Sequence, residues 1–501
     1  FGRWLMLFDH LRRHDALLGK QTLDDTHALA LHPHLGPEFE RDRNQVVDRR
    51  VVKERRLRRG NRRRRRCGIW HATQHSGCLA AGKAARTAPS TKLYSFTVNP
   101  VPSFNRATAR RIVLSSALVG ALSSFSMNAV VPALPEIQAY FSATVAQTQI
   151  IISAGLLALA LGNLLIAPLS DRIGRKPIVV AGLAVFSVAN VVAAVAPDIR
   201  VVIAARIVQA FGIGAGTAVA RAAINDYFGP ERAATGIALT AMAILFVPLV
   251  APTVGGFATE WFGWRTPLAL TAVFGLGAGL YILLGTESTQ PPGPTPGERP
   301  PGMLQSYATL LGDPGFRAFA LYGSFLLCAI YTFVTGAPYV ARQLMQLSAS
   351  DYGLWAALPA AASLCGFATA ARISRRVGAS AMLAAGTGLA LLGGFWMLIA
   401  AGLHVRHPLA LFAPAMLISF AQSISLPNAM AGALGLRPKL AGAASGLMGF
   451  LQLALAAIWA QGVGAAANGT SWPLGIAICA ATMLAALCWL RLRALTEIRT
   501  G

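Results

Sequence analysis

The chain has 501 residues, of which 54% are hydrophobic and only 13% carry a charge. Soluble domains carry about 25% charged residues, so the composition excludes an ordinary soluble protein and indicates a chain that lies within a bilayer. The net charge of +24 excludes an acidic protein and is unevenly spread, because residues 1–100 supply half of it.

The first segment, residues 1–105, is basic and has no apolar run of spanning length. Three interpretations are open: a disordered tail that contacts anionic lipid, an arm that binds nucleic acid, and an upstream extension that the functional protein lacks. We expect the last, and hence no nucleic-acid partner. A Cys/His cluster in this segment departs from the usual order of zinc ligands, so we expect no metal site. Its members are Cys67, His71, His75 and Cys78.

From residue 106 onward, apolar runs alternate with short polar turns. A helix needs about 20 apolar residues to cross a bilayer and a strand about half as many, so these runs predict helices. We expect an all-α integral membrane protein with twelve spans. They lie at about 112–134, 148–169, 178–197, 201–222, 235–258, 266–285, 318–341, 352–371, 379–402, 408–430, 441–464 and 473–491.

A break at residues 287–313 divides the spans into six at 106–286 and six at 314–501. Its Pro and Gly content cannot continue a helix and predicts a semi-rigid cytoplasmic linker. The two halves also resemble each other, because Asp171-Arg-Ile-Gly174 recurs as Arg375-Arg-Val-Gly378, 204 positions later. Two similar six-helix bundles are typical of secondary transporters that bind cargo between the halves, although a duplicated structural bundle would show the same repeat.

The distribution of Lys and Arg predicts the sidedness of the chain. With both termini in the cytoplasm, the inner segments from residue 101 on carry eighteen Lys and Arg, and the outer loops carry four. Short loops rich in these residues remain on the cytoplasmic side. We therefore expect both termini inside.

The most specific motif is the charged turn between the second and third spans. A carboxylate at Asp171 is favoured by the dipole of the following helix and can pair with basic neighbours, and Gly174 permits a tight reversal. An ordinary positive-inside loop would explain the basic residues but not the Asp and Gly. The candidate inner gate consists of Asp171, Arg172, Gly174, Arg175 and Lys176.

This turn resembles the loop between helices two and three of the major facilitator superfamily, although Ala167 stands where that family usually has Gly. Arg206 and Gln209, followed by three spaced glycines, are similar to the family's fourth-helix motif. The segment from Pro248 to Gly256 is similar to the fifth-helix motif of its drug-exporting antiporters. Prolines in spans one, seven and ten are similar to those of the Bcr/CflA-type multidrug exporters.

The resemblance covers residues 106–492 and implies roles for two groups of residues. Arg206 would organise a polar centre, since a guanidinium in hydrocarbon needs a wet cavity and a partner; the alternative is that it reaches the outer surface. The fifth-span residues would kink the helix, let a neighbour approach closely and gate the outer side. They are Pro248, Pro252, Gly255 and Gly256.

Proton coupling is implied by the resemblance but lacks its usual carrier. Bcr/CflA-type exporters usually carry Asp at the position of Asn128, and an amide cannot titrate. We find no Asp or Glu well inside any span. Either Glu136 or Asp226 takes this role, or the coupling is weak or different.

Polar and aromatic residues on otherwise apolar helices are candidates for a substrate cavity, although each polar one could equally form an interhelical hydrogen bond. Few fixed charges among them favour amphipathic, neutral or cationic compounds. They are Phe125, Asn128, Gln209, Phe246, Tyr331, Phe333, Gln422, Asn428 and Gln452.

These inferences together predict an exporter of small amphipathic compounds that works by alternating access and exchanges its cargo for protons. We expect no enzyme activity, no cofactor besides the proton gradient, a monomer, and a multi-pass location in a bacterial inner membrane. Two alternatives remain: an exporter of a metabolite, sugar or siderophore, and a receptor or scaffold that has the same fold but does not transport.

Overall fold

The computed structural model describes residues 106–286 and 303–500 of the chain. The expectations about the basic segment 1–105, with its Cys/His cluster, and about linker residues 287–302 lie outside these described residues. So do the side chains of three candidate site residues, which are Asp171, Arg172 and Asp226.

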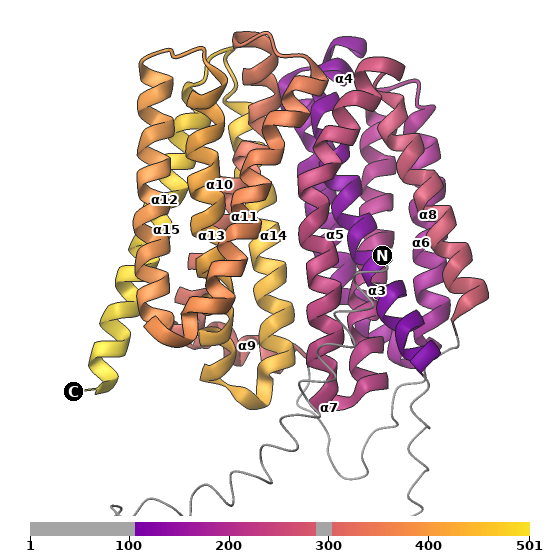
Figure 1. The fold of residues 1–501 in the computed structure, drawn as a ribbon, viewed down its shortest axis with the longest axis vertical. Helices are drawn as coiled ribbons and strands as arrows, with labels where there is room; N and C mark the ends of the chain where they lie inside the picture. Colours follow the sequence, from indigo (N-terminus) through magenta and orange to yellow (C-terminus); the bar gives the residue numbers. More distant parts are fainter. Residues whose placement is uncertain (1–105, 287–302, 501) are drawn as a thin grey trace, which may run out of the picture. The chain divides into compact units, whose positions relative to one another are not determined.

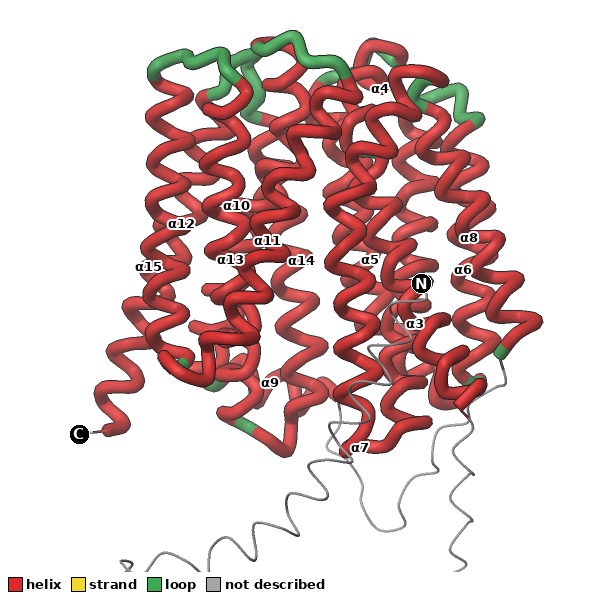
Figure 2. Tube along the Cα trace, viewed as in Figure 1, coloured by secondary structure: helices red, strands yellow, loops and turns green. Residues whose placement is uncertain are grey.

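The described residues form helices and no strand, as the tube in Figure 2 shows. Twelve helical segments are long and apolar enough to cross a membrane, which confirms the expected number. The first half contains α3 (Arg106–Ala129), η2 (Val131–Ala133), α4 (Leu134–Tyr140), α5 (Val145–Ile173), α6 (Arg175–Ala194), α7 (Ile199–Phe262) and α8 (Arg265–Gly285). The second contains α9 (Met303–Gly312), α10 (Pro314–Leu344), α11 (Ala349–Val377), α12 (Ala379–Gly402), α13 (Pro408–Leu436), η3 (Pro438–Leu440), α14 (Ala441–Ala465) and α15 (Trp472–Thr500).

Helix α7 contains two spans, Ile199–Thr217 and Thr240–Phe262. Their contacts with α3 show that the two spans run in opposite directions. The first span runs antiparallel to α3, and the second runs parallel to it. The contacts that fix these directions are Ser116–Ala220 and Ser126–Arg206 for the first span, and Gly120–Ile244 and Ala129–Gly255 for the second. The twelve spans therefore divide six and six, and Figure 1 shows the two halves side by side.

Two equivalent turns support the internal repeat. Gly174 ends α5 and precedes α6 with a φ of 104°, and Gly378 ends α11 and precedes α12 with a φ of 83°. A residue with a Cβ rarely adopts these angles, so glycine allows both helix pairs to reverse within one residue. The two glycines are 204 positions apart, which matches the spacing of the sequence repeat.

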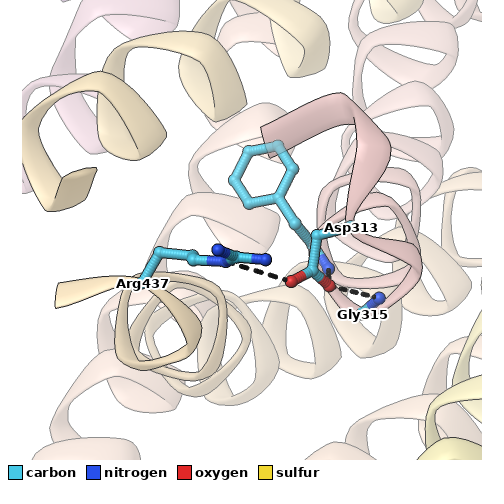
Figure 3. A network of polar contacts seen from close by, with 4 residues as sticks. Asp313, Gly315 and Arg437 are labelled. Atoms are coloured by element: carbon cyan, nitrogen blue, oxygen red, sulfur yellow. Dashed lines mark hydrogen bonds and ion pairs between the residues drawn. The ribbon is translucent and has the colours of Figure 1, made fainter. Parts of the chain in front are cut away.

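The expected linker is partly helical, which differs from the prediction for residues 287–313. Residues 303–312 form α9, which packs Leu310 against the second half. Asp313 then caps α10 by accepting hydrogen bonds from the amides of Gly315 and Phe316 (2.9 and 3.3 Å). The same carboxylate pairs with Arg437 at 3.5 Å, which ties the start of α10 to the end of α13 (Figure 3).

The buried hydrophobic side chains are organised differently at the two ends of the helices, named here the α4 end and the α9 end (Figure 1). Near the α4 end one cluster joins both halves, with Ile152 of α5, Phe333 of α10 and Ala456 of α14. Toward the α9 end each half has clusters of its own, around Leu183 in the first and Phe316 in the second. The shared core of the two halves therefore lies at the α4 end.

Candidate functional site

A buried polar group lies between α3 and the first span of α7. Arg206 Nη1 donates a hydrogen bond to Ser126 Oγ (2.9 Å), and its Nη2 donates to the Ser126 carbonyl (3.3 Å). Gln209 Nε2 donates to the same Ser126 Oγ at 2.8 Å. Because positions 206 and 209 are one helical turn apart, both side chains leave α7 on the same face and reach one serine.

Arg206 is only 1% exposed, so its guanidinium does not reach the outer surface. A charge at such a position costs about 2.5–3.5 kcal/mol even on the lenient insertion scale, and the Ser126 contacts offset part of that cost. Within the described residues, Arg206 Nε and Gln209 Oε1 have no hydrogen-bond partner, and no ion pair of those residues involves Arg206. The polar centre is therefore cationic and incompletely satisfied.

Asn128, at the position of the usual carrier, and Glu136, a candidate carrier, both form local contacts. Asn128 Nδ2 donates to the Ser124 carbonyl of its own helix at 2.8 Å. Glu136 is exposed at the start of α4, where its Oε1 accepts a hydrogen bond from the Trp264 amide (3.2 Å) and so joins α4 to the start of α8. Among the described residues, neither of these hydrogen bonds involves Arg206, Gln209 or Ser126.

Two basic residues of the charged turn, Arg175 and Lys176, are bound within the first half. Arg175 is buried, and its Nη1 donates to Ser170 Oγ (2.5 Å). Lys176 Nζ donates to the Thr286 carbonyl at the end of α8 (2.7 Å). Both side chains line a small hollow at the α9 end of α3, α6, α7 and α8. The turn thus connects α5 and α6 to α8.

Three of the candidate cavity residues form packing contacts between helices. Phe125 lies edge-to-face against Phe274 of α8. Phe333 is buried in the shared core against Phe412 of α13. Asn428 Nδ2 donates to Ser374 Oγ of α11 (3.2 Å) and to the Ile424 carbonyl. Each of these three side chains therefore joins two helices in this structure.

The other candidate cavity residues differ in exposure. Phe246 is 57% exposed, whereas Tyr331 and Gln422 are half-buried. Gln452 of α14 is buried close to Gly323 of α10, and its Nε2 has no hydrogen-bond partner among the described residues. Gln452 is therefore the side chain of the second half that most resembles Gln209 in burial and in its unused hydrogen-bonding group.

One strip of contact between the halves joins α5 to α14 and α10 near the α4 end. Gln461 Oε1 accepts a hydrogen bond from Ser153 Oγ (2.8 Å), and its Nε2 donates to the Ala146 carbonyl (3.1 Å). Gln149 Nε2 donates in the opposite direction, to the Thr335 carbonyl of α10 (3.2 Å). Gly464 lies directly against the Gln149 side chain, where a Cβ would overlap it. We call this contact the amide strip.

A second strip joins the second span of α7 to α11. Gly256 lies against the Ala349 backbone and Gly353 against the Pro252 backbone, so that a Cβ on either glycine would overlap main-chain atoms. Thr253 Oγ1 donates to the Gly353 carbonyl at 3.0 Å. We call this contact the glycine strip. It contains two of the predicted outer-gate residues, Pro252 and Gly256.

The glycine strip ends in a carboxylate that crosses between the halves. Glu260 Oε2 accepts a hydrogen bond from the Ser350 amide (3.0 Å), within the first turn of α11. A negative charge is favoured there because the first amides of a helix have no partner within it. Gly255, next to the strip, instead packs against Ala129 of α3 within the first half.

Several of these residues were missed by the sequence analysis. Ser126, Gln149, Gln461 and Gly464 stand in ordinary apolar runs with no motif around them. The repeat offers one signal, because Gln149 and Gly353 are 204 positions apart and occupy equivalent places on α5 and α11. The two halves carry different residues, Gln and Gly, at this equivalent position. That difference could have indicated a functional position.

The fold and the contacts together define a polytopic helical membrane protein of two six-helix halves that share a core at one end. The family model of the Major Facilitator Superfamily matches residues 116–461, which is more than half of the chain. The chain therefore belongs to the Major Facilitator Superfamily, a family of transporters and not of enzymes. The resemblance inferred from the motifs is confirmed.

Three similar proteins illustrate this relationship. Multidrug resistance protein D of Escherichia coli (strain K12) is 28% identical over 381 residues, which cover 76% of this chain and 95% of the relative. Bicyclomycin resistance protein homolog of Haemophilus influenzae is 24% identical over 379 residues, covering 75% and 94%. A crystal structure of a bacterial homolog to the human lysosomal transporter Spinster has a TM-score of 0.62 at 18% identity, covering 78% and 98%. The last similarity concerns the fold alone.

Proposed function

We propose that this chain is a secondary exporter of small amphipathic compounds that works by alternating access. The observation that carries the proposal is the arrangement of the contacts between the halves, since both strips and the shared core lie at the α4 end. Such an arrangement suits a protein whose halves rock about a central site and close one end at a time. The names of the two relatives support export of drugs.

We propose a location in a bacterial inner membrane with both termini in the cytoplasm and the α4 end outside, an orientation that the Lys and Arg distribution supports. In this mechanism the strips close the outer end, and Asp171, Arg172 and Arg175 close the inner end. The polar centre of Arg206 and Gln209 lies between them, about 12 Å from the start of α7 at 1.5 Å per residue. We propose a monomer, because each chain contains both halves.

Proton antiport is proposed on the resemblance to the exporter group. Glu136 and Asp226 remain the candidate carriers, since Asn128 cannot titrate. Glu136 is exposed at the outer end, where a proton from outside reaches it directly.

The test compares accumulation of a fluorescent amphipathic cation in cells with and without the protein. We expect lower accumulation in cells that contain it, and a protonophore should remove the difference. The substitution Arg206→Ala leaves Ser126 and Gln209 without their cation. Cells that contain this variant should accumulate as much dye as cells without the protein. Equal accumulation in all these cells, with the protein present in the membrane, would favour a metabolite exporter or a receptor instead. A difference that survives the protonophore would contradict proton coupling alone.

A further inference from the structure

The amide strip connects the halves by reciprocal glutamines. Gln461 of the second half reaches the first half with both atoms of its amide group, to Ser153 and to Ala146, and Gln149 of the first half reaches Thr335 of the second. These hydrogen bonds join residues 186 to 315 positions apart. No residue of this group carries a charge, so the contact depends on direct hydrogen bonds and not on ion pairing.

The strip is buried around Gln149 and half-buried at Gln461. Gln149 is 1% exposed, and the absence of a Cβ at Gly464 leaves the space that its amide group fills. Thr335, its acceptor, is fully buried on α10. When the halves separate at this end, Gln461 exchanges two protein partners for water, and Gln149 leaves its groove.

We propose that Gln149, Ser153 and Gln461 form an uncharged latch that holds the outer end closed, and that breaking this latch is the step that opens the transporter to the outside. The inference rests on the alternating-access mechanism proposed above and adds residues that the motifs do not contain. It places the control of opening in α5 and α14, whereas the fifth-span motif lies on the other strip. These are positioning residues, because they act through the separation of the halves.

A native thiol offers a direct measure of the latch. Cys328 is fully buried in the core shared by both halves. It lies on the same face of α10 as Thr335 and two turns, about 10 Å, farther from the outer end. A polar thiol reagent added outside therefore reaches Cys328 only after the halves have separated at the strip.

The experiment uses the full chain with Cys328 as its single cysteine, the other five being replaced, in membrane vesicles of known sidedness. Gln461→Leu removes both hydrogen bonds of that amide. Two bonds of ordinary strength correspond to about a thirty-fold shift in the closed-to-open equilibrium. Labelling of Cys328 from the outer side should accelerate by about that factor, with no acceleration from the inner side.

Two further variants grade the effect, and one serves as a control. Ser153→Ala removes one bond only, so it should accelerate labelling by less. Gln461→Glu keeps the acceptor for Ser153 but places a carboxylate oxygen against the Ala146 carbonyl, so it should accelerate labelling at least as much as Gln461→Leu. Gln305→Leu makes the same chemical change at an exposed position of α9 and should leave labelling unchanged.

Unchanged labelling in Gln461→Leu would overturn the latch, and so would equal acceleration from both sides or in Gln305→Leu. These outcomes are independent of the cargo. If labelling responds as expected while the native protein exports no dye, the latch stands and the proposed drug export is wrong. If dye export is normal and labelling does not respond, export stands and the latch is wrong.

Discussion

The two strips that join the halves occupy equivalent places but use different chemistry. On the amide strip, Gln149 projects from α5 and fills the groove that Gly464 leaves on α14. On the glycine strip, the equivalent residue of α11 is Gly353, and the main chains themselves come together. Side-chain contacts can be lost one at a time and can adjust, whereas contact between main chains is lost as a whole. The first strip is therefore suited to yield in steps during opening, and the second to close the outer end as a single unit.

Among the substitutions that test the difference between the strips, the largest effect is expected at Gly256. In Gly256→Leu the new side chain meets the Ala349 backbone, which cannot move aside without displacing α11. Overpacking of a tight interface costs about 1–3 kcal/mol, and contact with main chain places this variant at the upper end, about a hundredfold in the closed-to-open equilibrium. Outer-side labelling of Cys328 should rise accordingly, and dye export should fall.

Gly277→Leu is the matched control for this variant, because a Cβ at Gly277 of α8 meets nothing within 4 Å. Labelling that rises equally in both variants would show a general loosening and would contradict a closing role for the glycine strip.

An intermediate effect is expected at Gly464. In Gly464→Ala the added methyl meets the end of the Gln149 side chain, which is flexible, so we expect a cost of about 1 kcal/mol and about a fivefold rise in labelling. Gln149→Ala in the same chain should cancel part of the effect of the methyl group, because it removes the obstructing atoms. A double-mutant cycle measures this coupling.

Gly462 lies two residues away on the same helix with open space around it, so Gly462→Ala should leave the labelling rate of Cys328 unchanged. Strictly additive effects of Gly464→Ala and Gln149→Ala would show that the added methyl group and the Gln149 side chain do not compete for the same space.

The smallest effect is expected at Glu260. Glu260→Gln keeps an acceptor for the Ser350 amide but removes the charge at the start of α11, which is worth about 0.3–1 kcal/mol at low salt. Labelling of Cys328 should rise about two- to threefold, and added salt should abolish the difference from the native chain.

Asp313→Asn provides the contrast, since Asp313 caps α10 and pairs with Arg437 within one half. It should lower the melting temperature slightly and leave labelling unchanged. An effect on labelling as large as that of Glu260→Gln would remove the distinction between contacts within and between the halves.

The sequence was sufficient for the features that depend on local composition. The twelve spans follow from length and apolarity, and the reversal at Gly174 follows from a residue that tolerates positive φ. The first span extends to Tyr140, beyond its expected end, because Pro132 and Pro135 begin new helical segments in place of ending the helix. Helix α9 was missed because ten uncharged residues follow a Pro-rich segment and are too short to span.

The sequence was not sufficient for contacts that depend on how a helix is rotated about its axis. Arg206 called for a partner, but a serine in an apolar run, such as Ser126, gives no sign of the face it occupies. Gln149 and Gln461 are separated by most of the membrane part, and only the packing of both halves brings them to the same end. The motif residues Pro252 and Gly256 indicated one strip, and no motif indicated the other.

Ser126 connects α3 to α7 through its hydroxyl oxygen, which accepts hydrogen bonds from both Arg206 and Gln209. Sliding of α3 along α7 would break both bonds together, so in the proposed mechanism these two spans would move as one rigid unit. The choice of compound at the centre would then be independent of the rate at which the outer end opens. Substitutions in the strips would alter how fast compounds leave, and substitutions around Ser126 would alter which compounds are accepted.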